Sequence, residues 1–303
     1  MSNEFKSQAV GYASELDKVF EAKSVVRLFE NNNIGISFVG KKSIVIPEVT
    51  FYGMVNYDRV DGFVESDVVF DGKPYTLEMD RGRTLSIDRM DMDETGIASL
   101  AGKILGEYVR TKAVPECDAF CLSKLAKIAE GKENVVAFNS QKPFETFYSM
   151  AHKVYNKAGY NEELVCFVSG SVLAALESSD ENHKILNVTN GDGSINTAVR
   201  KINGITLIPV PDDRMKTSFN FINSDDPRQG GFTVDTLAKN IDMLMLPKKA
   251  ATLVKKTEKM RIFTADENQK KDAYKFDYRV YYDIIVTSSK AETIQLAEST
   301  IDQ

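Results

Sequence analysis

The sequence predicts an α+β protein, and three features of its pattern carry that prediction. Apolar residues between Ile97 and Val109 recur at helical spacing, which predicts a long amphipathic helix. Aromatic and β-branched residues fill every second position from Tyr274 to Val286, which predicts one unusually long strand. Between them, residues 135–250 alternate helical and extended patterns, so helices and strands belong to a mixed fold.

The composition bounds the class of protein. The chain has 303 residues, of which 43% are apolar and 27% charged, as in a folded protein with two domains or one elaborate one. Three cysteines, an odd number, indicate a reducing compartment, and the lack of a signal peptide or long apolar run predicts a soluble cytosolic product. The net charge of −6 gives no general attraction to a nucleic-acid backbone.

The first ninety residues read as an arm followed by extended chain. An amphipathic helical pattern over residues 3–30 ends at an Asn- and Gly-rich stretch, and residues 35–49 read as strand, turn, strand. Residues 50–90 predict a long hairpin with few residues for a core of its own, which must therefore lie on something else. Both "VDGF" and "DRGR", which interrupts the alternation at Asp80–Arg83, are possible turns.

The acidic stretch that follows is a candidate site. Asp91 and Asp93 match the opening of a calcium loop, but position twelve is Gly102 where the loop needs a bidentate glutamate. Asp91 and Glu94 instead form a capping-box arrangement at the start of the long helix. The hypothesis of a carboxylate-dependent α/β enzyme using Asp88, Asp91 and Asp93 requires these groups to converge on a pocket.

A second helix is predicted from Pro115, with Cys117, Cys121 and Leu125 on its buried face. With only two histidines in the chain, the cysteines lack the further ligands that zinc requires, so no metal is expected. Gly102 and Gly106 lie opposite the apolar stripe of the first helix, either as tolerated surface glycines or because something approaches closely there.

The middle of the chain predicts an α/β subdomain. The pattern gives a helix over 143–157, a strand at 164–170, a short helix after it and a strand at 204–210. The serine in "VSGSV" lacks the flanking glycines of a nucleophile elbow. Phosphate-binding glycine motifs are absent from the sequence, so no cofactor is expected.

The order of these parts resembles the major capsid proteins of tailed bacteriophages with the Hong Kong 97 fold. The resemblance covers nearly the whole chain and is carried by several segments that recur in order: "GMVNYDRVDGF", "YTLEMDRGRTLSIDRMDMDE", "VPECDAFCLSKLA", "IPVPDDRM" and "DAYKFDYRVYYDIIV". It implies an N-terminal arm, N-terminal strands with an extended loop, a peripheral domain with a spine helix and return strands, and an axial domain. The corresponding ranges are 1–33, 34–90, 91–135 with 250–303, and 136–249.

The resemblance also implies a function without catalysis, cofactor or metal. The chain would assemble through pentamers and hexamers into an icosahedral shell around phage double-stranded DNA, made in the host cytoplasm and ending in the virion. Because the chain begins directly at the arm, the resemblance implies a separate scaffolding protein, unless a scaffolding extension has already been removed. Portal and decoration proteins are further partners. The alternative with the same fold is a bacterial encapsulin-type nanocompartment.

Two groups of residues become candidate contacts between subunits. The charged residues of the extended segment are candidate salt bridges to a neighbour, or else a solvated rim: Arg59, Asp80, Arg81, Arg83, Asp88 and Arg89. Gly102 and Gly106 would let the neighbour's backbone come close. In "IPVPDDRM", Asp213 and Arg214 are candidate contacts at the capsomer centre, with an ordinary surface loop as the alternative.

Overall fold

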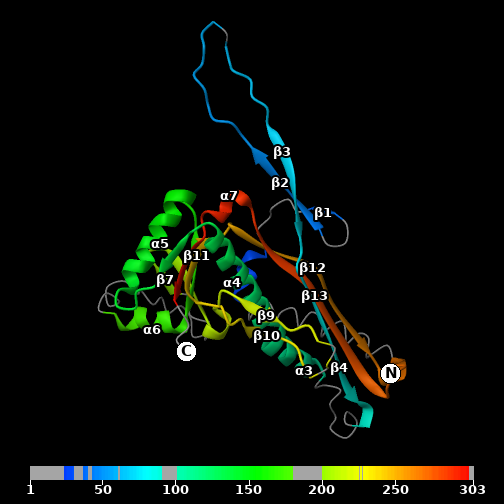
Figure 1. Cartoon of the computed structure of the whole chain (residues 1–303). Helices are drawn as coiled ribbons and strands as arrows, with labels where there is room; N and C mark the ends of the chain where they lie inside the picture. The colour runs from blue at the N-terminus through cyan, green and yellow to red at the C-terminus, as the bar shows by residue number, and fades with distance from the viewer. Residues whose placement is uncertain are drawn as a thin grey trace, which may run out of the picture.

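The computed structural model describes residues 24–30, 37–39, 43–60, 62–90, 101–179, 200–224, 226 and 228–299. They form a body of two sheets and a long helix, from which one hairpin projects (Figure 1). Helices and several sheets share the body, so the α+β prediction is confirmed.

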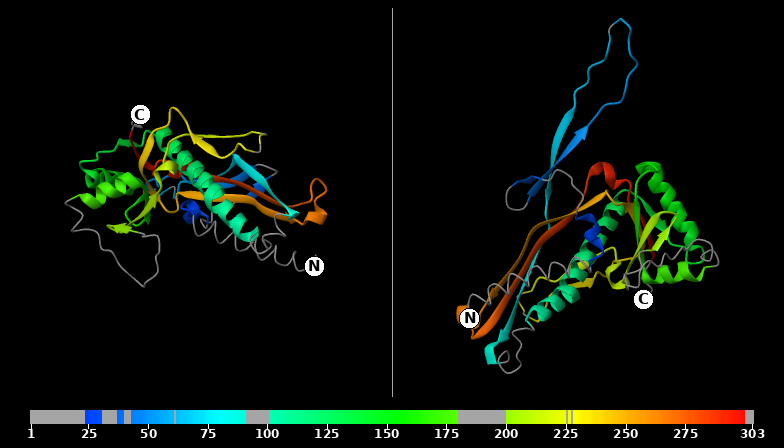
Figure 2. Two further views of the ribbon diagram at one scale, coloured as in Figure 1. Left: turned by 90° about the horizontal axis from the view of Figure 1, so that it is seen from below. Right: turned by 180° about the vertical axis from the view of Figure 1, so that it is seen from behind.

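A long antiparallel sheet makes one side of the body. Its strands are β12 (Ala251–Phe263), β13 (Ala273–Val286) and β4 (Met79–Asp88), in the order β12-β13-β4. β13 has 14 residues, and its register with β12 runs from Ala251 opposite Val286 to Phe263 opposite Lys275. The predicted long strand is confirmed, it pairs antiparallel with β12, and Figure 2 shows the three strands running side by side.

The hypothesis that "DRGR" forms a turn is wrong. β4 continues through Asp80–Arg83, with Asp80 opposite Tyr281 and Arg83 opposite Tyr278 of β13. The side chains alternate along the whole strand between an exposed face and a partly buried one, and the two arginines lie on the partly buried face. Arginines on the inner face interrupt the hydrophobic pattern of the sequence without ending the strand. The backbone pleat alone directs successive side chains to opposite faces, whatever their polarity.

The spine of the body is an unbroken run of helical residues. It comprises α3 (Ala101–Tyr108), the π-helical segment η3 (Val109–Ala113) and α4 (Val114–Gly131). The prediction of a separate helix beginning at Pro115 is therefore corrected. Pro115 has no N–H to donate to the preceding turn, which accounts for the wider turn just before it. The predicted cap at Asp91 and Glu94 lies outside the described residues.

The second sheet has six strands and helices packed on it. Its order is β5 (Val135–Ala137), β14 (Gln295–Ser299), β11 (Asn240–Pro247), β6 (Leu164–Ser169), β8 (Ile205–Val210) and β7 (Arg200–Ile202). Helices α5 (Pro143–Ala158) and α6 (Gly170–Ser178) pack against it, α6 follows β6 directly, and β6 pairs in parallel with β8. The helices and strands predicted between residues 143 and 210 are confirmed.

Short elements complete the described chain. They are the 3₁₀ turns η1 (Val26–Phe29), η5 (Asp212–Arg214) and η6 (Ala265–Glu267), the helix α7 (Ser288–Ala291), and the hairpin β9 (Phe219–Phe221) with β10 (Phe232–Val234). No helix within these residues is long and apolar enough to cross a membrane.

Two clusters of buried side chains hold the body. The larger lies between α4 and both sheets and includes Cys117, Cys121 and Leu125, so the predicted buried face of this helix is confirmed. The smaller lies between the six-stranded sheet and the helices α5 and α6. The core thus joins the two sheets through the spine helix and leaves the projecting hairpin out.

Candidate subunit interface

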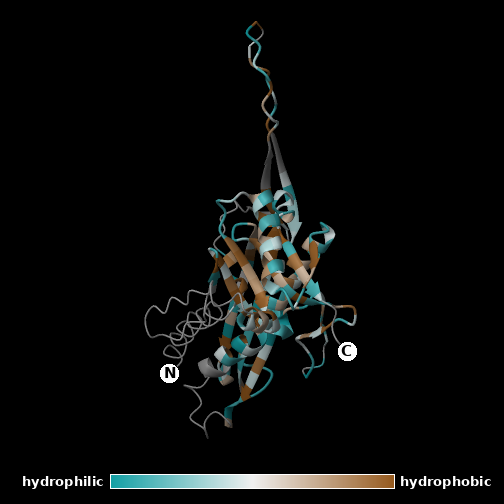
Figure 3. Ribbon diagram, turned by 90° about the vertical axis from the view of Figure 1, so that its left-hand side faces the viewer, coloured by the Kyte–Doolittle hydropathy of each residue, from teal (hydrophilic) through white to brown (hydrophobic). Residues whose placement is uncertain are grey.

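The projecting hairpin is built from β2 (Ser43–Thr50) and β3 (Val69–Thr76), with β1 (Ser37–Val39) beside β2. β2 and β3 pair from Ser43 opposite Thr76 to Thr50 opposite Val69, which leaves residues 51–68 as the loop. Figures 1 and 3 show this loop extending far from the body. The prediction of one long hairpin over residues 50–90 is therefore corrected: the hairpin spans Ser43–Thr76, and Met79–Asp88 form a strand of the long sheet.

The loop is exposed and rich in apolar side chains. Of the thirteen large apolar side chains exposed among the described residues, nine lie between residues 51 and 68. Met54 is 102% exposed, Val60 90% and Phe63 87%. The nine are Phe51, Tyr52, Met54, Val55, Tyr57, Val60, Phe63, Val64 and Val68. So many exposed apolar side chains in one short segment are typical of a protein interface.

The tip of the loop is a small closed turn. The amide of Gly62 donates to the carbonyl of Asp58 at 2.9 Å, and the Asp58 carboxylate accepts from the amide of Val60 at 2.7 Å. Gly62 has a φ of +84°, which favours glycine, and the rings of Tyr57 and Phe63 meet with centroids 4.9 Å apart. Of the two turns that the sequence left open, "VDGF" is the tip.

Only the base of the hairpin packs on the body. Ile44, Ile46 and Leu77 form a separate buried cluster with Val254 of β12 and with Tyr281 and Ile285 of β13. The Nζ of Lys73 adds a hydrogen bond to the Ser288 hydroxyl at 2.5 Å. The hairpin is therefore held firmly at one end, while the apolar side chains of its loop are covered by no other described residue.

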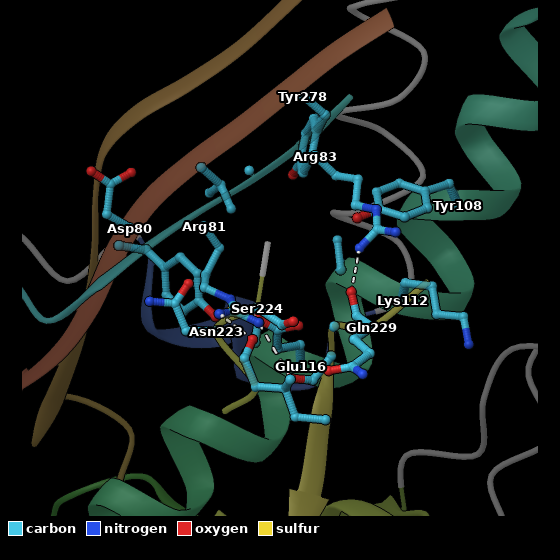
Figure 4. A pocket seen from close by; sticks show the side chains of 18 residues that line it. Asp80, Arg81, Arg83, Tyr108, Lys112, Glu116, Asn223, Ser224, Gln229 and Tyr278 are labelled. Atoms are coloured by element: carbon cyan, nitrogen blue, oxygen red, sulfur yellow. Dashed lines mark hydrogen bonds and ion pairs between the residues drawn. The ribbon is translucent and has the colours of Figure 1, made fainter. Parts of the chain in front are cut away.

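Arg81, one of the candidate contact residues, binds within the chain. Its Nε lies 2.5 Å from Oε1 of Glu116 on α4, and its two terminal nitrogens donate to the carbonyls of Ile222 and Gly231 at 3.1 and 3.3 Å. This guanidinium joins β4, the spine helix and the loop between β9 and β10 (Figure 4). Sequence reasoning missed Glu116, which carries no signal beyond its place in the first turn of a helix.

Arg83 holds the same loop. Its Nη1 donates to the carbonyl of Gln229 at 2.8 Å, and a Cβ at Gly230 would lie 2.8 Å from that nitrogen. The two arginines line a cavity of about 200 Å³ together with Tyr108, whose pKa is raised by burial, and Lys112. Figure 4 shows both guanidinium groups directed toward the loop.

The other charged candidates lie on exposed surface. Asp80 and Arg279 of β13 form a pair with two contacts, at 2.8 and 2.5 Å. Arg89 lies 3.0 Å from Asp266 and 3.6 Å from Asp272 at the far end of the long sheet. Arg59 lies exposed at the loop tip, and Asp88 is exposed with Oδ1 accepting from the amide of Met90 at 3.0 Å. Contact with another subunit stays a prediction for all six.

The "IPVPDDRM" segment is tied into the body. Asp212 accepts from the amide of Gly170 at the start of α6 at 2.6 Å, while Arg214 lies 3.1 Å from Asp118 of α4. Arg214 is mostly buried, and Asp213 is 71% exposed. Of the two candidate contact residues in this segment, Asp213 is therefore the one whose side chain is mostly accessible to another subunit.

Among the buried acids that the sequence did not indicate are Asp118 and Asp283. Asp118 is fully buried within α4, and burial raises its pKa to about 6. Asp283 lies between the alternating apolar positions of the long strand, a place typical of an exposed face, but it is 1% exposed and lies 2.8 Å from Nζ of Lys124. Periodicity assigns a face to each residue, whereas neighbouring elements cover both faces at this end of the strand. Burial also raises the pKa of Asp283.

The glycines of the spine helix are only partly described. Gly102 and Gly106 both lie in α3, and Gly106 is half-buried. The burial of Gly102 is not described, so the close approach of a neighbouring subunit to these glycines stays a prediction.

The residues of the enzyme hypothesis are not brought together in the described part of the chain. Asp88 is exposed at the end of β4, and Asp91 and Asp93 lie outside the described residues. Within the described ranges, no three His, Cys, Asp or Glu side chains are placed to hold a metal ion.

Comparison with known proteins finds similarity only at the level of structure. No protein-family profile and no curated protein sequence matches the chain. The mature capsid of bacteriophage PhiM1 aligns with a TM-score of 0.57 and 16% identity, over 92% of this chain and 88% of that one. The capsid of Ralstonia phage GP4 aligns with a TM-score of 0.55 and 12% identity, over 94% and 91% of the chains.

A virus-like particle from Pyrococcus furiosus aligns as well, with a TM-score of 0.50 and 11% identity over 95% of this chain and 98% of that one. At such low identity the similarity concerns the fold. The chain has the Hong Kong 97-like fold of phage capsid proteins.

Proposed function

We propose that this protein is a structural shell subunit, the major capsid protein of a tailed phage. The observation that carries the proposal is the loop of residues 51–68, whose nine large apolar side chains are exposed while the base of the hairpin is firmly packed. Water-exposed apolar surface of this extent is costly, and burial against another copy of the chain removes the cost. The fold shared with phage capsids supports the same conclusion.

The proposed assembly is a closed icosahedral shell. Its interfaces are non-covalent and repeated around five-fold and six-fold axes, so subunits form pentamers and hexamers. Interfaces in which one subunit lies across the next are large and obligate. The net charge of −6 suits a container that encloses DNA without gripping it or reading its sequence.

The domain roles follow the elements. Residues 1–33 would form the arm, 34–90 the N-terminal strands and extended loop, 91–135 with 250–303 the peripheral domain, and 136–249 the axial domain. The described strand β4 pairs in the long sheet, so residues 79–88 would act with the peripheral domain. Asp213 and the exposed pair Asp80 with Arg279 are contact candidates on the described surface, and Gly106 of α3 stays a candidate for close approach.

The proposed partners are those of a phage head. A scaffolding protein would guide curvature, a portal would occupy one vertex, and decoration proteins would bind outside. The subunit would be made in the host cytoplasm and end in the virion.

The second candidate function is the shell of a protein nanocompartment. The similarity to the virus-like particle of Pyrococcus furiosus over 98% of that chain favours it as the alternative. The two functions differ in their contents, since one shell encloses a packaged genome and the other an enzyme cargo.

Electron microscopy of the purified protein, with and without a co-expressed scaffold, tests the proposal. We expect closed shells in which residues 51–68 lie on a neighbouring subunit. A discrete monomer or dimer under both conditions would overturn the proposal. Shells produced without a scaffold that carry a cargo enzyme would favour the nanocompartment.

A further inference from the structure

Residues 24–30 are inserted at the junction of the two sheets. Val26 and Phe29 of η1 are 0% exposed, and the ring of Phe29 lies 5.9 Å from that of Phe167 on β6. Both belong to the core cluster that also contains Leu253 of β12. A segment of seven residues therefore contacts the six-stranded sheet and the long sheet at once.

Polar contacts fix each end of this segment. The Ser24 hydroxyl donates to Oδ1 of Asp118 at 2.8 Å, and the amide of Val26 points to the same oxygen at 3.5 Å. At the other end, Oε1 of Glu30 lies 2.5 Å from Nζ of Lys255 on β12. One end of the segment is thereby bound to the spine helix and the other to the long sheet.

Two of the groups that donate hydrogen bonds to the Asp118 carboxylate, those of Ser24 and Val26, belong to the segment of residues 24–30. The other partner of Asp118 is Arg214, whose Nη1 lies 3.1 Å from Oδ2, and burial raises the pKa of the carboxyl to about 6. A buried carboxylate is stable only while its oxygens are bonded. Withdrawal of the segment would remove the Ser24 and Val26 donors and admit water to the Asp118 carboxylate. The carboxylate is therefore bonded to the segment in the inserted state and to water in the withdrawn state.

We propose that residues 24–30 form a latch that holds the six-stranded sheet and the long sheet at a fixed angle. While the segment is inserted, Asp118, Phe167 and Lys255 are joined through it. When it withdraws, the rest of the fold stays intact and the two sheets can turn relative to each other about the spine helix.

Hydrogen exchange on the full-length protein tests whether the segment opens by itself. The amides to follow are those of Val26 and of Glu30, which donates to the carbonyl of Arg27 at 2.8 Å. In Ser24→Ala we expect both to exchange about tenfold faster, since a bond to a carboxylate is lost. Amides of β6 and β11 should keep their rates. The same loss of a hydroxyl in Ser178→Ala, on the exposed side of α6, is the control and should change neither set.

The coupling of the two sheets needs a second measurement. Spin labels on cysteines introduced at Lys201 of β7 and Lys259 of β12 report the distance between the sheets, because both sites are exposed and the three native cysteines are buried. Dilution with unlabelled protein suppresses distances between copies. We expect the distance distribution to broaden in Ser24→Ala and further in Phe29→Ala, and to stay unchanged in Ser178→Ala.

Two outcomes would overturn the latch. In the first, the amides of Val26 and Glu30 exchange together with the β11 amides in every variant, so the segment never opens alone. In the second, the segment opens in Ser24→Ala but the distribution of distances between the sheets stays as narrow as in the unaltered protein.

Discussion

Arg81 on β4 and Glu116 on α4 form an ion pair, 2.5 Å between Nε and Oε1, that ties the long sheet to the spine helix. Both side chains are mostly buried, at 24% and 13% exposure. The same guanidinium also bonds two backbone carbonyls of the loop between β9 and β10. One side chain thus sets the mutual position of three elements, which is the role expected of a planar group with five donors.

Replacing Arg81 by glutamine should destabilise the subunit by about 2–4 kcal/mol. The change removes the ion pair, leaves Glu116 largely buried without its partner and frees two carbonyls. Urea unfolding of the unassembled subunit, followed by circular dichroism, measures the loss. Arg279→Gln is the matched control, because its pair with Asp80 is exposed and should contribute less than about 1 kcal/mol. Equal effects of the two substitutions would contradict the role assigned to Arg81.

Gly230 is expected to be intolerant of a side chain. Its φ is +149°, and an added Cβ would lie 2.8 Å from Nη1 of Arg83, which itself holds the carbonyl of Gln229. Gly230→Ala should therefore cost about 1–3 kcal/mol and loosen the loop over the cavity. Gly131→Ala, at the end of α4 with open space around it, should be neutral or stabilising. The free energies of unfolding of the two variants provide the measurement, and a neutral Gly230→Ala would refute the close approach.

The sequence predicted an element correctly where its apolar residues recurred with a single period, that of a strand or that of a helix. The alternation of β13, the buried stripe of Cys117 and Cys121, and the helix α5 all follow from spacing, because each element has one face against the core. An extended hairpin could be inferred before the long helix because this segment contains too few apolar residues to form a core of its own.

What the sequence could not indicate were interactions that depend on distant parts of the chain. "DRGR" looked like a turn because two arginines stood on an inner face, and their partners lie about 35 and 150 residues away. The burial of Asp118 depends on Ser24 and Arg214, far apart in sequence. No local pattern records such pairs, so the sequence could not indicate the partners of Arg81 and Asp118 within the chain.

Polar substitutions in the loop should separate assembly from folding. Val60→Ser with Phe63→Ser alters two side chains that are 90% and 87% exposed, so the unassembled subunit should keep its free energy of unfolding within about 0.5 kcal/mol. Assembly should fall sharply, because these apolar groups would no longer be buried between copies. Sedimentation of the assembly mixture measures the fraction of protein in shells.

Tyr160→Ser is the control for the loop variant, since Tyr160 is 68% exposed but lies beside α5. It should assemble as the unaltered chain does. If the loop variant assembled normally, residues 51–68 would not be the contact surface; if it unfolded more easily instead, the loop would pack on its own subunit.

The stability of the subunit should fall as the pH rises from about 4 to about 7, in part because of Asp242 on β11. Burial, with negative Asp212 and Glu298 nearby, raises the pKa of this carboxyl from 3.8 to about 6. The folded protein therefore binds a proton that the unfolded chain has lost, so this contribution is complete below pH 3.8 and disappears as the pH rises through about 6.

Asp242→Asn should reduce the slope of unfolding free energy against pH, measured by urea unfolding at several pH values. Part of the slope should remain, because Asp118 is shifted in the same direction. Asp213→Asn, at a site 71% exposed, is the control and should leave the slope unchanged. Parallel pH profiles for Asp242→Asn and the unaltered chain would mean that the Asp242 carboxyl is hydrated in solution.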